Sequence, residues 1–172
     1  GRTVAPQEGN RALEQAIAEM AGSPTAFDVY AVMTGLPLHG GEPGPLPGID
    51  PRPAYRIGGV RLFPRTHGYP LTEWTIGPLC RWMADRRIPL LLWHTEFDWT
   101  EVYALARSCP DLAIILESQP RKILYHARAL IGLLHACPNV HAEISNLTAP
   151  LFDRIVEHVG PQRLIFGSFL PV

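Results

Sequence analysis

The second half of the sequence contains three side chains that could transfer a proton, His94, Glu117 and Glu143. An imidazole titrates near neutral pH, so His94 could act as a general base or a metal ligand, or could simply be a hydrogen-bonded structural residue. Glu143 lies in an apolar segment, where an unpaired carboxylate is costly. We expect Arg61 or Lys122 to pair with Glu143, unless it binds a ligand. We predict that His94, Glu117 and Glu143 carry any catalysis.

Further polar side chains follow the apolar segments and could bind a substrate. They are Arg61, His67, Gln119, Arg121, Lys122 and Asn146. Arg121 and Lys122, together with free backbone N–H groups of a following helix, could hold a carboxylate or a phosphate. The alternative is a helix start whose charges are solvated. We therefore expect a small-molecule substrate or ligand.

These residues are positioned by a regular alternation of apolar strands and amphipathic helices. The pattern predicts strands at 27–33, 59–63, 88–93, 112–116, 140–144 and 163–166, and helices at 10–21, 73–86, 98–107, 121–136 and 148–159. Such alternation favours an α/β fold with parallel strands and right-handed crossovers, whose carboxyl ends share one edge. We predict a TIM-barrel-like (β/α) fold with about six of the eight βα units, or else an open doubly wound parallel sheet.

The chain of 172 residues is expected to form a single domain, a partial barrel over residues 1–172. Residues 34–58 interrupt the alternation of strands and helices with a Pro/Gly-rich inserted loop, which could be a surface excursion or a lid. The sequence ends directly after the last strand with no closing helix, so we expect a truncated chain. Unfinished sheet edges could promote self-association.

Composition excludes several classes of protein. Fifteen Lys and Arg against sixteen Asp and Glu give a net charge of −1, with no basic face of the kind that binds nucleic acid. No apolar run reaches the ~18–20 residues that cross a membrane, and no signal pattern precedes the first helix. Three widely spaced cysteines are expected to be reduced thiols, as in a cytoplasmic protein.

Four segments resemble the amidohydrolase-related (amidohydrolase 2) TIM-barrel family. Gly58-Gly-Val-Arg-Leu62 resembles the family's fourth strand, and Arg87-Ile-Pro-Leu-Leu-Leu-Trp-His94 its fifth, which ends in a metal-binding histidine. Cys137-Pro-Asn-Val-His-Ala-Glu-Ile-Ser145 resembles the seventh strand, and Gly160-Pro-Gln-Arg-Leu-Ile-Phe-Gly-Ser168 the eighth. The resemblance implies a hydrolase or decarboxylase that acts on a small organic molecule with a divalent metal such as zinc.

The departures from that family concern the metal ligands. The sequence has no His-x-His, Phe169 stands where the eighth strand should supply an aspartate, and the sixth strand ends in Glu117-Ser-Gln119 in place of a histidine. His94 is the one family metal position that survives, whereas a catalytic zinc needs about three protein ligands. The resemblance is therefore to a metal-depleted subgroup. A metal-free small-molecule-binding barrel and an inactive fragment remain alternatives to an enzyme.

Overall fold

The computed structural model describes residues 5–20, 30–37, 56–117, 126–145 and 147–167. The strands are β1 (Tyr30–Thr34), β2 (Arg56–Leu62), β3 (Leu90–Trp93), β4 (Ile114–Glu117), β5 (Val140–Glu143) and β6 (Leu164–Ile165). The helices are α1 (Pro6–Met20), α2 (Pro64–His67), α3 (Glu73–Asp85), α4 (Trp99–Ser108), α5 (Ala127–Ala136) and α6 (Ala149–His158), with a 3-10 turn η1 (Pro161–Arg163). Each predicted strand and helix is present, although residues 21, 27–29 and 121–125 of the predicted ranges lie outside the described residues.

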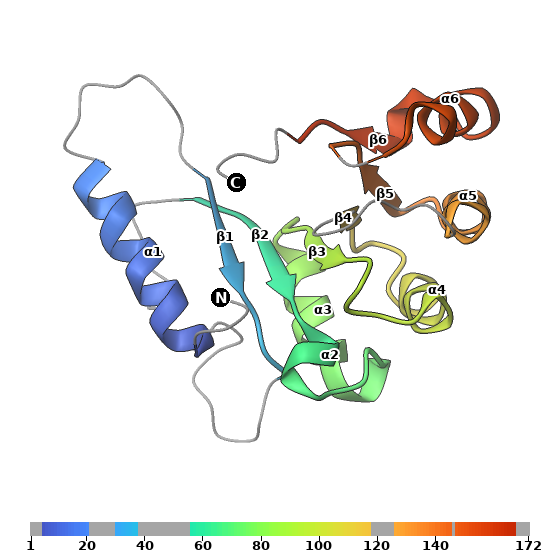
Figure 1. Cartoon of the computed structure of the whole chain (residues 1–172). Helices are drawn as coiled ribbons and strands as arrows, with labels where there is room; N and C mark the ends of the chain where they lie inside the picture. The colour runs from blue at the N-terminus through green and yellow to red at the C-terminus, as the bar shows by residue number, and fades with distance from the viewer. Residues whose placement is uncertain (1–4, 21–29, 38–55, 118–125, 146, 168–172) are drawn as a thin grey trace.

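The described strands form one parallel sheet in the order β1-β2-β3-β4-β5-β6. Each strand therefore lies beside its neighbours in sequence, and the order never reverses. A doubly wound sheet has such a reversal, at which its ligands bind. The sequential order is that of a barrel wall, so the TIM-barrel-like prediction is confirmed and the doubly wound alternative is wrong. Figure 1 shows the strands fanning from β1 to β6, with α3 to α6 along one side.

One face of the sheet makes the core with the helices. Its strand positions are apolar and almost fully buried: Val60, Leu62, Leu90, Leu92, Ile114, Leu116, Val140 and Ala142. They pack against helix residues such as Leu79, Val102 and Leu134. Because side chains alternate along a strand, the intervening positions point to the opposite face. A helix layer over the first face thus leaves the second free to carry polar groups.

We call that second face the polar face, and define it by Arg61, Trp93, Glu117, His141 and Glu143. Parallel register pairs Trp93 with Glu117 and places Arg61 and His141 in line across the sheet. The sheet thus has one apolar face and one face that carries ionisable side chains, of which Glu117 and Glu143 are each 7% exposed.

Local interactions fix the ends of the elements around the sheet. Asp98 starts α4 with a complete capping box, in which its side chain accepts from Thr100 N–H and the Glu101 side chain reaches back to the cap. This confirms the helix start expected at Asp98. At the other end of α4, the Asn139 side chain donates to the carbonyls of Ala106, Cys109 and Leu112. These bonds hold α4 firmly against β4 and β5.

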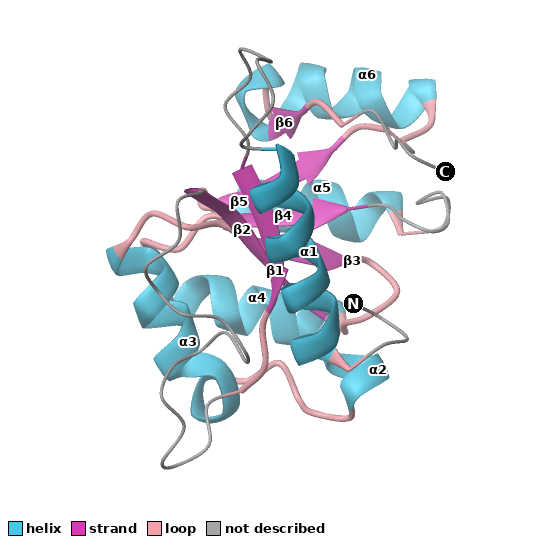
Figure 2. Cartoon of the chain, turned by 90° about the vertical axis from the view of Figure 1, so that its left-hand side faces the viewer, coloured by secondary structure: helices cyan, strands magenta, loops and turns pink. Residues whose placement is uncertain are grey.

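The helix α1 is fastened to the edge strand β1. The Asn10 side chain accepts from Thr34 N–H at 2.8 Å and donates to the Thr34 carbonyl at 2.9 Å. Figure 2 looks at this edge and shows α1 lying across it. Residues 38–55, most of the expected Pro/Gly-rich loop, lie outside the described residues. Among the described helices, none is long and apolar enough to cross a membrane.

Candidate functional site

An ion pair crosses the centre of the polar face. Arg61 of β2 donates from Nε to Glu117 Oε2 at 2.9 Å and from Nη2 to Glu117 Oε1 at 2.6 Å. These residues lie on strands separated by β3, and the guanidinium bridges the gap by passing over the Trp93 ring, 5.8 Å from its centroid. The Glu117 residue is only 7% exposed. A bidentate pair over an aromatic face is a rigid arrangement, because the planar fork of arginine fits both carboxylate oxygens.

Glu143 does not pair with Arg61, one of the two partners that the sequence suggested, and the other, Lys122, lies outside the described residues. The Glu143 carboxylate accepts from the backbone N–H and the hydroxyl of Ser145, both at 2.7 Å. Glu143 lies on β5, three strands from β2, and strands are spaced about 4.8 Å apart, so an arginine on β2 meets Glu117 first. The backbone of Gly167 also approaches so closely that any side chain there would collide with Glu143. Local donors thus satisfy this buried carboxylate.

His94 follows β3 directly and is 9% exposed. Its backbone N–H donates to the Glu117 carbonyl at 2.9 Å, which extends the β3–β4 ladder by one residue. Its ring nitrogen Nδ1 is buried and makes no hydrogen bond within the described part of the chain. Burial lowers the pKa of His94, the nearby Glu117 carbonyl opposes this in part, and His126 adds to the lowering. The ring is therefore neutral at neutral pH, the form that accepts a proton.

Buried polar atoms without partners gather in the two segments that follow β2 and β3. Besides His94 Nδ1, they include His67 Nδ1 and the Thr95 hydroxyl, neither of which has a hydrogen-bond partner among the described residues. Burial lowers the pKa of His67, although the Glu96 carboxylate opposes this, and burial raises the pKa of Tyr69. Unpaired buried polar groups cost free energy, and these atoms lie in two segments at the carboxyl ends of β2 and β3.

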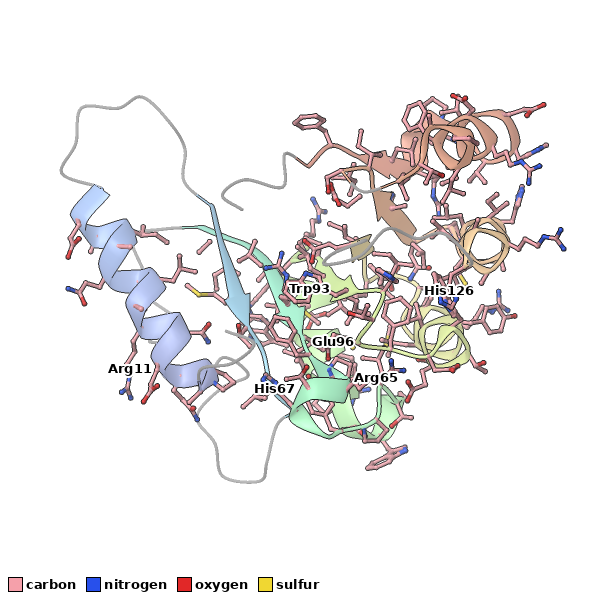
Figure 3. All side chains as sticks on the ribbon, in the orientation of Figure 1. Arg11, Arg65, His67, Trp93, Glu96 and His126 are labelled. Atoms are coloured by element: carbon pink, nitrogen blue, oxygen red, sulfur yellow. The ribbon has the colours of Figure 1, made fainter. Side chains whose placement is uncertain are left out.

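Glu96 joins the two segments. Glu96 is 2% exposed, and its carboxylate accepts from the backbone N–H and the hydroxyl of Thr66, both at 2.8 Å. Arg65 in turn donates to the carbonyls of Thr95 and Phe97. Figure 3 shows Trp93, Glu96 and His67 in succession from the sheet towards α2. No role was assigned to Glu96 from the sequence. A partner in a different βα unit leaves no spacing signal in the sequence.

His126, to which no role was assigned from the sequence, is the N-cap of α5, where Trp99 Nε1 donates to His126 Nδ1 at 3.2 Å. The centroids of the His126 and His94 rings are 6.5 Å apart. His126 is exposed and lies beside the candidate base His94.

The remaining predicted site residues cannot be placed. Gln119, Arg121, Lys122 and Asn146 lie outside the described residues, as does Phe169. Of the predicted set, the structure joins Arg61 to Glu117 and brings the backbone of His94 against Glu117. It puts His67 on α2, where its ring contacts Phe63.

The metal centre implied by the resemblance does not fit the described residues. His94 has a ring nitrogen to offer, but both oxygens of Glu117 are bonded to Arg61 and both oxygens of Glu143 to Ser145. Within the described ranges, no three His, Cys, Asp or Glu side chains are grouped so that they could hold a metal ion. A catalytic metal needs about three such ligands, and the described residues supply His94 with no such companions.

Sequential parallel strands with polar groups at their carboxyl ends define an α/β protein of the TIM-barrel class. A sequence profile of the amidohydrolase family matches residues 4–172. The chain belongs to the amidohydrolase family.

Two solved structures are similar in fold. Amidohydrolase 2 from Bifidobacterium longum subsp. infantis is 18% identical with a TM-score of 0.62, and the match covers 94% of this chain and 61% of that protein. An uncharacterized TIM-barrel protein from Bordetella bronchiseptica is 16% identical with a TM-score of 0.53, over 98% of this chain and 52% of that protein. The chain thus spans roughly half to three fifths of the length of these structures. A search of curated proteins found no match.

Proposed function

We propose that the chain forms the proton-transferring part of an amidohydrolase-type hydrolase or decarboxylase that acts on a small organic molecule, with His94 as the general base. The observation that carries this proposal is that His94 Nδ1 and the Thr95 hydroxyl, directly after β3, are buried and have no hydrogen-bond partner among the described residues. In barrels of parallel strands, ligands bind at this end.

The chemistry assigned to His94 follows from its environment. Burial favours the neutral ring, whose unprotonated nitrogen accepts a proton. In a hydrolysis, that nitrogen takes a proton from the attacking water and later passes it to the leaving group. In the decarboxylation of a carboxylic acid, the neutral ring first takes the carboxyl proton, and the imidazolium so formed returns that proton to the carbon that loses carbon dioxide. Arg61 and Glu117 fix the Trp93 side of the site, since their bidentate bond leaves little freedom to either side chain.

The test is a turnover screen with matched histidine variants. The full chain is assayed against small amides, lactones and aryl carboxylates, following proton release and carbon dioxide. His94→Gln should lower kcat by about 10²-fold or more, the usual contribution of a general base, whereas His135→Gln on the exposed side of α5 should not. Turnover in His94→Gln within twofold of the parent would rule out His94 as the base.

A second candidate is a metal-free binding barrel without catalysis. It is favoured by the fact that Glu117 and Glu143 are already satisfied by Arg61 and Ser145, which leaves neither free for chemistry. The same compounds then serve in a thermal-shift assay. The binding protein would be favoured by a compound that is recovered unchanged and that raises the Tm of the parent chain more than the Tm of His94→Gln. A chain that neither binds nor turns over any compound would favour an inactive fragment.

A further inference from the structure

His126 and Trp99 form a contact that the proposed reaction does not use. Trp99 is the first residue of α4, and His126 is the N-cap of α5. Besides the bond from Trp99 Nε1 to His126 Nδ1, the two rings lie 5.7 Å apart between centroids and are inclined by 32°. Phe97 packs edge-on against the Trp99 ring, with the ring centroids 5.3 Å apart and the ring planes inclined by 85°. The indole is therefore held from two sides, on a helix whose start is fixed by a capping box.

The direction of this hydrogen bond determines where His126 carries its hydrogen. An indole N–H can only donate, so Nδ1 of His126 must present its lone pair. A neutral imidazole has one N–H and one lone pair, so the hydrogen of His126 is on Nε2. Trp99 thus selects one of the two tautomers. The ring of His126 then offers an N–H donor at Nε2.

The Nε2–H donor of His126 lies on a ring close to that of His94. The centroids of the His126 and His94 rings are 6.5 Å apart and the rings are inclined by 55°, so the two rings are neighbours that do not stack. His94 brings a buried ring whose Nδ1 has no partner in the described residues, and His126 brings an exposed ring with a fixed donor. A neutral acceptor beside a neutral donor can bind two atoms of one small molecule. Donors aimed at an oxygen that gains charge are a strong source of catalysis.

We propose that His126, held by Trp99 as the Nε2–H tautomer, donates a hydrogen bond to a carbonyl oxygen of the molecule that reacts at His94. This inference rests on the proposed function for the reaction, but the tautomer itself does not. No bond of His126 is made or broken in the step, because its N–H only stabilises negative charge on the substrate oxygen. The substrate class is accordingly a carbonyl compound, such as an amide, an ester or a carboxylic acid, with the carbonyl on the α5 side of His94.

The tautomer is tested first, by ¹⁵N NMR of the histidine side chains in the full chain. Spectra of His126→Gln and His135→Gln assign the signals. We expect one dominant Nε2–H form of His126 in the parent chain and a mixture of tautomers in Trp99→Phe. That substitution keeps an aromatic side chain at position 99 but removes the indole N–H donor. A parent signal from the Nδ1–H form, or a spectrum of Trp99→Phe identical to that of the parent, would overturn the inference.

The role in the reaction is tested with a carbonyl substrate from the turnover screen. His126→Ala should lower kcat about tenfold or more, and His126→Gln, whose amide also ends in an N–H donor, should recover part of the loss. His135→Ala is the control and should leave kcat and KM unchanged. Loss of turnover in His94→Gln but not in His126→Ala would refute this inference while the proposed function stands. Absence of turnover in the parent chain would refute the proposed function and the substrate role of His126 together.

Discussion

Glu117→Gln tests whether the ion pair on the polar face matters for stability. The substitution keeps the shape of the side chain and removes its charge, so the Arg61 guanidinium stays over Trp93 without a counter-charge. Removing one partner of a fully buried pair costs about 3–5 kcal/mol, and exposed pairs are worth about 0–1 kcal/mol. Here the side chain of Glu117 is 10% exposed and that of Arg61 is 27% exposed. Because solvent reaches Arg61, we expect a loss of about 2–3 kcal/mol in the free energy of unfolding.

Urea denaturation measures this loss, and a second ion pair in the same chain provides the control. Arg81 and Glu73 are joined at 2.9 Å, but their side chains are 62% and 55% exposed. Glu73→Gln should therefore change the free energy of unfolding by less than about 1 kcal/mol. The comparison requires equal urea m-values in parent and variants. If Glu117→Gln costs no more than Glu73→Gln, burial does not strengthen the Arg61–Glu117 pair and the reasoning is wrong.

Three further outcomes can be measured on the same protein. Asp98→Ala should lower the Tm because the first turn of α4 loses its cap, whereas Asp98→Asn should retain it; equal Tm values for the two variants would contradict this. Burial raises the pKa of the Cys80 thiol, so iodoacetamide should label Cys80 slowly in the native chain and rapidly in urea, as peptide mass spectrometry would show. Burial lowers the pKa of His67, His94 and His141, so the unfolded chain takes up protons first and stability should fall as the pH drops below about 6.5. A Tm that rises between pH 7.5 and pH 5.5 would refute that assignment.

The order of elements could be predicted because each depends on a short stretch of sequence. The apolar run 88–93 gives β3, and Asp98 with Glu101 three residues later gives the start of α4. The shift of β2 to begin at Arg56 has a different cause. That strand pairs with β1, and the pairing extends it over Arg56 and Ile57. Local patterns locate an element, whereas pairing with another strand sets its ends.

The candidate site could be predicted only in part, because its contacts join distant residues. His94, Glu117 and Arg61 were recognised by type and by their place after or within a strand. That Arg61 reaches Glu117 and not Glu143 depends on strand order and on the Trp93 ring beneath the guanidinium. Neither can be read from spacing along the chain.

Charge pairing on the polar face determines the chemistry left to the site. In the described part of the chain, Arg61 neutralises Glu117, and Glu143 is satisfied by Ser145, so neither carboxylate is poised to ligate a metal or to act as a base. What remains near β3 is a buried neutral imidazole, His94, and the hydrogen bond that orients His126. A site of this kind binds through neutral hydrogen bonds, which salt screens little. Ligand affinity should therefore change little with ionic strength, and a steep salt dependence would point instead to charged groups beyond the described residues.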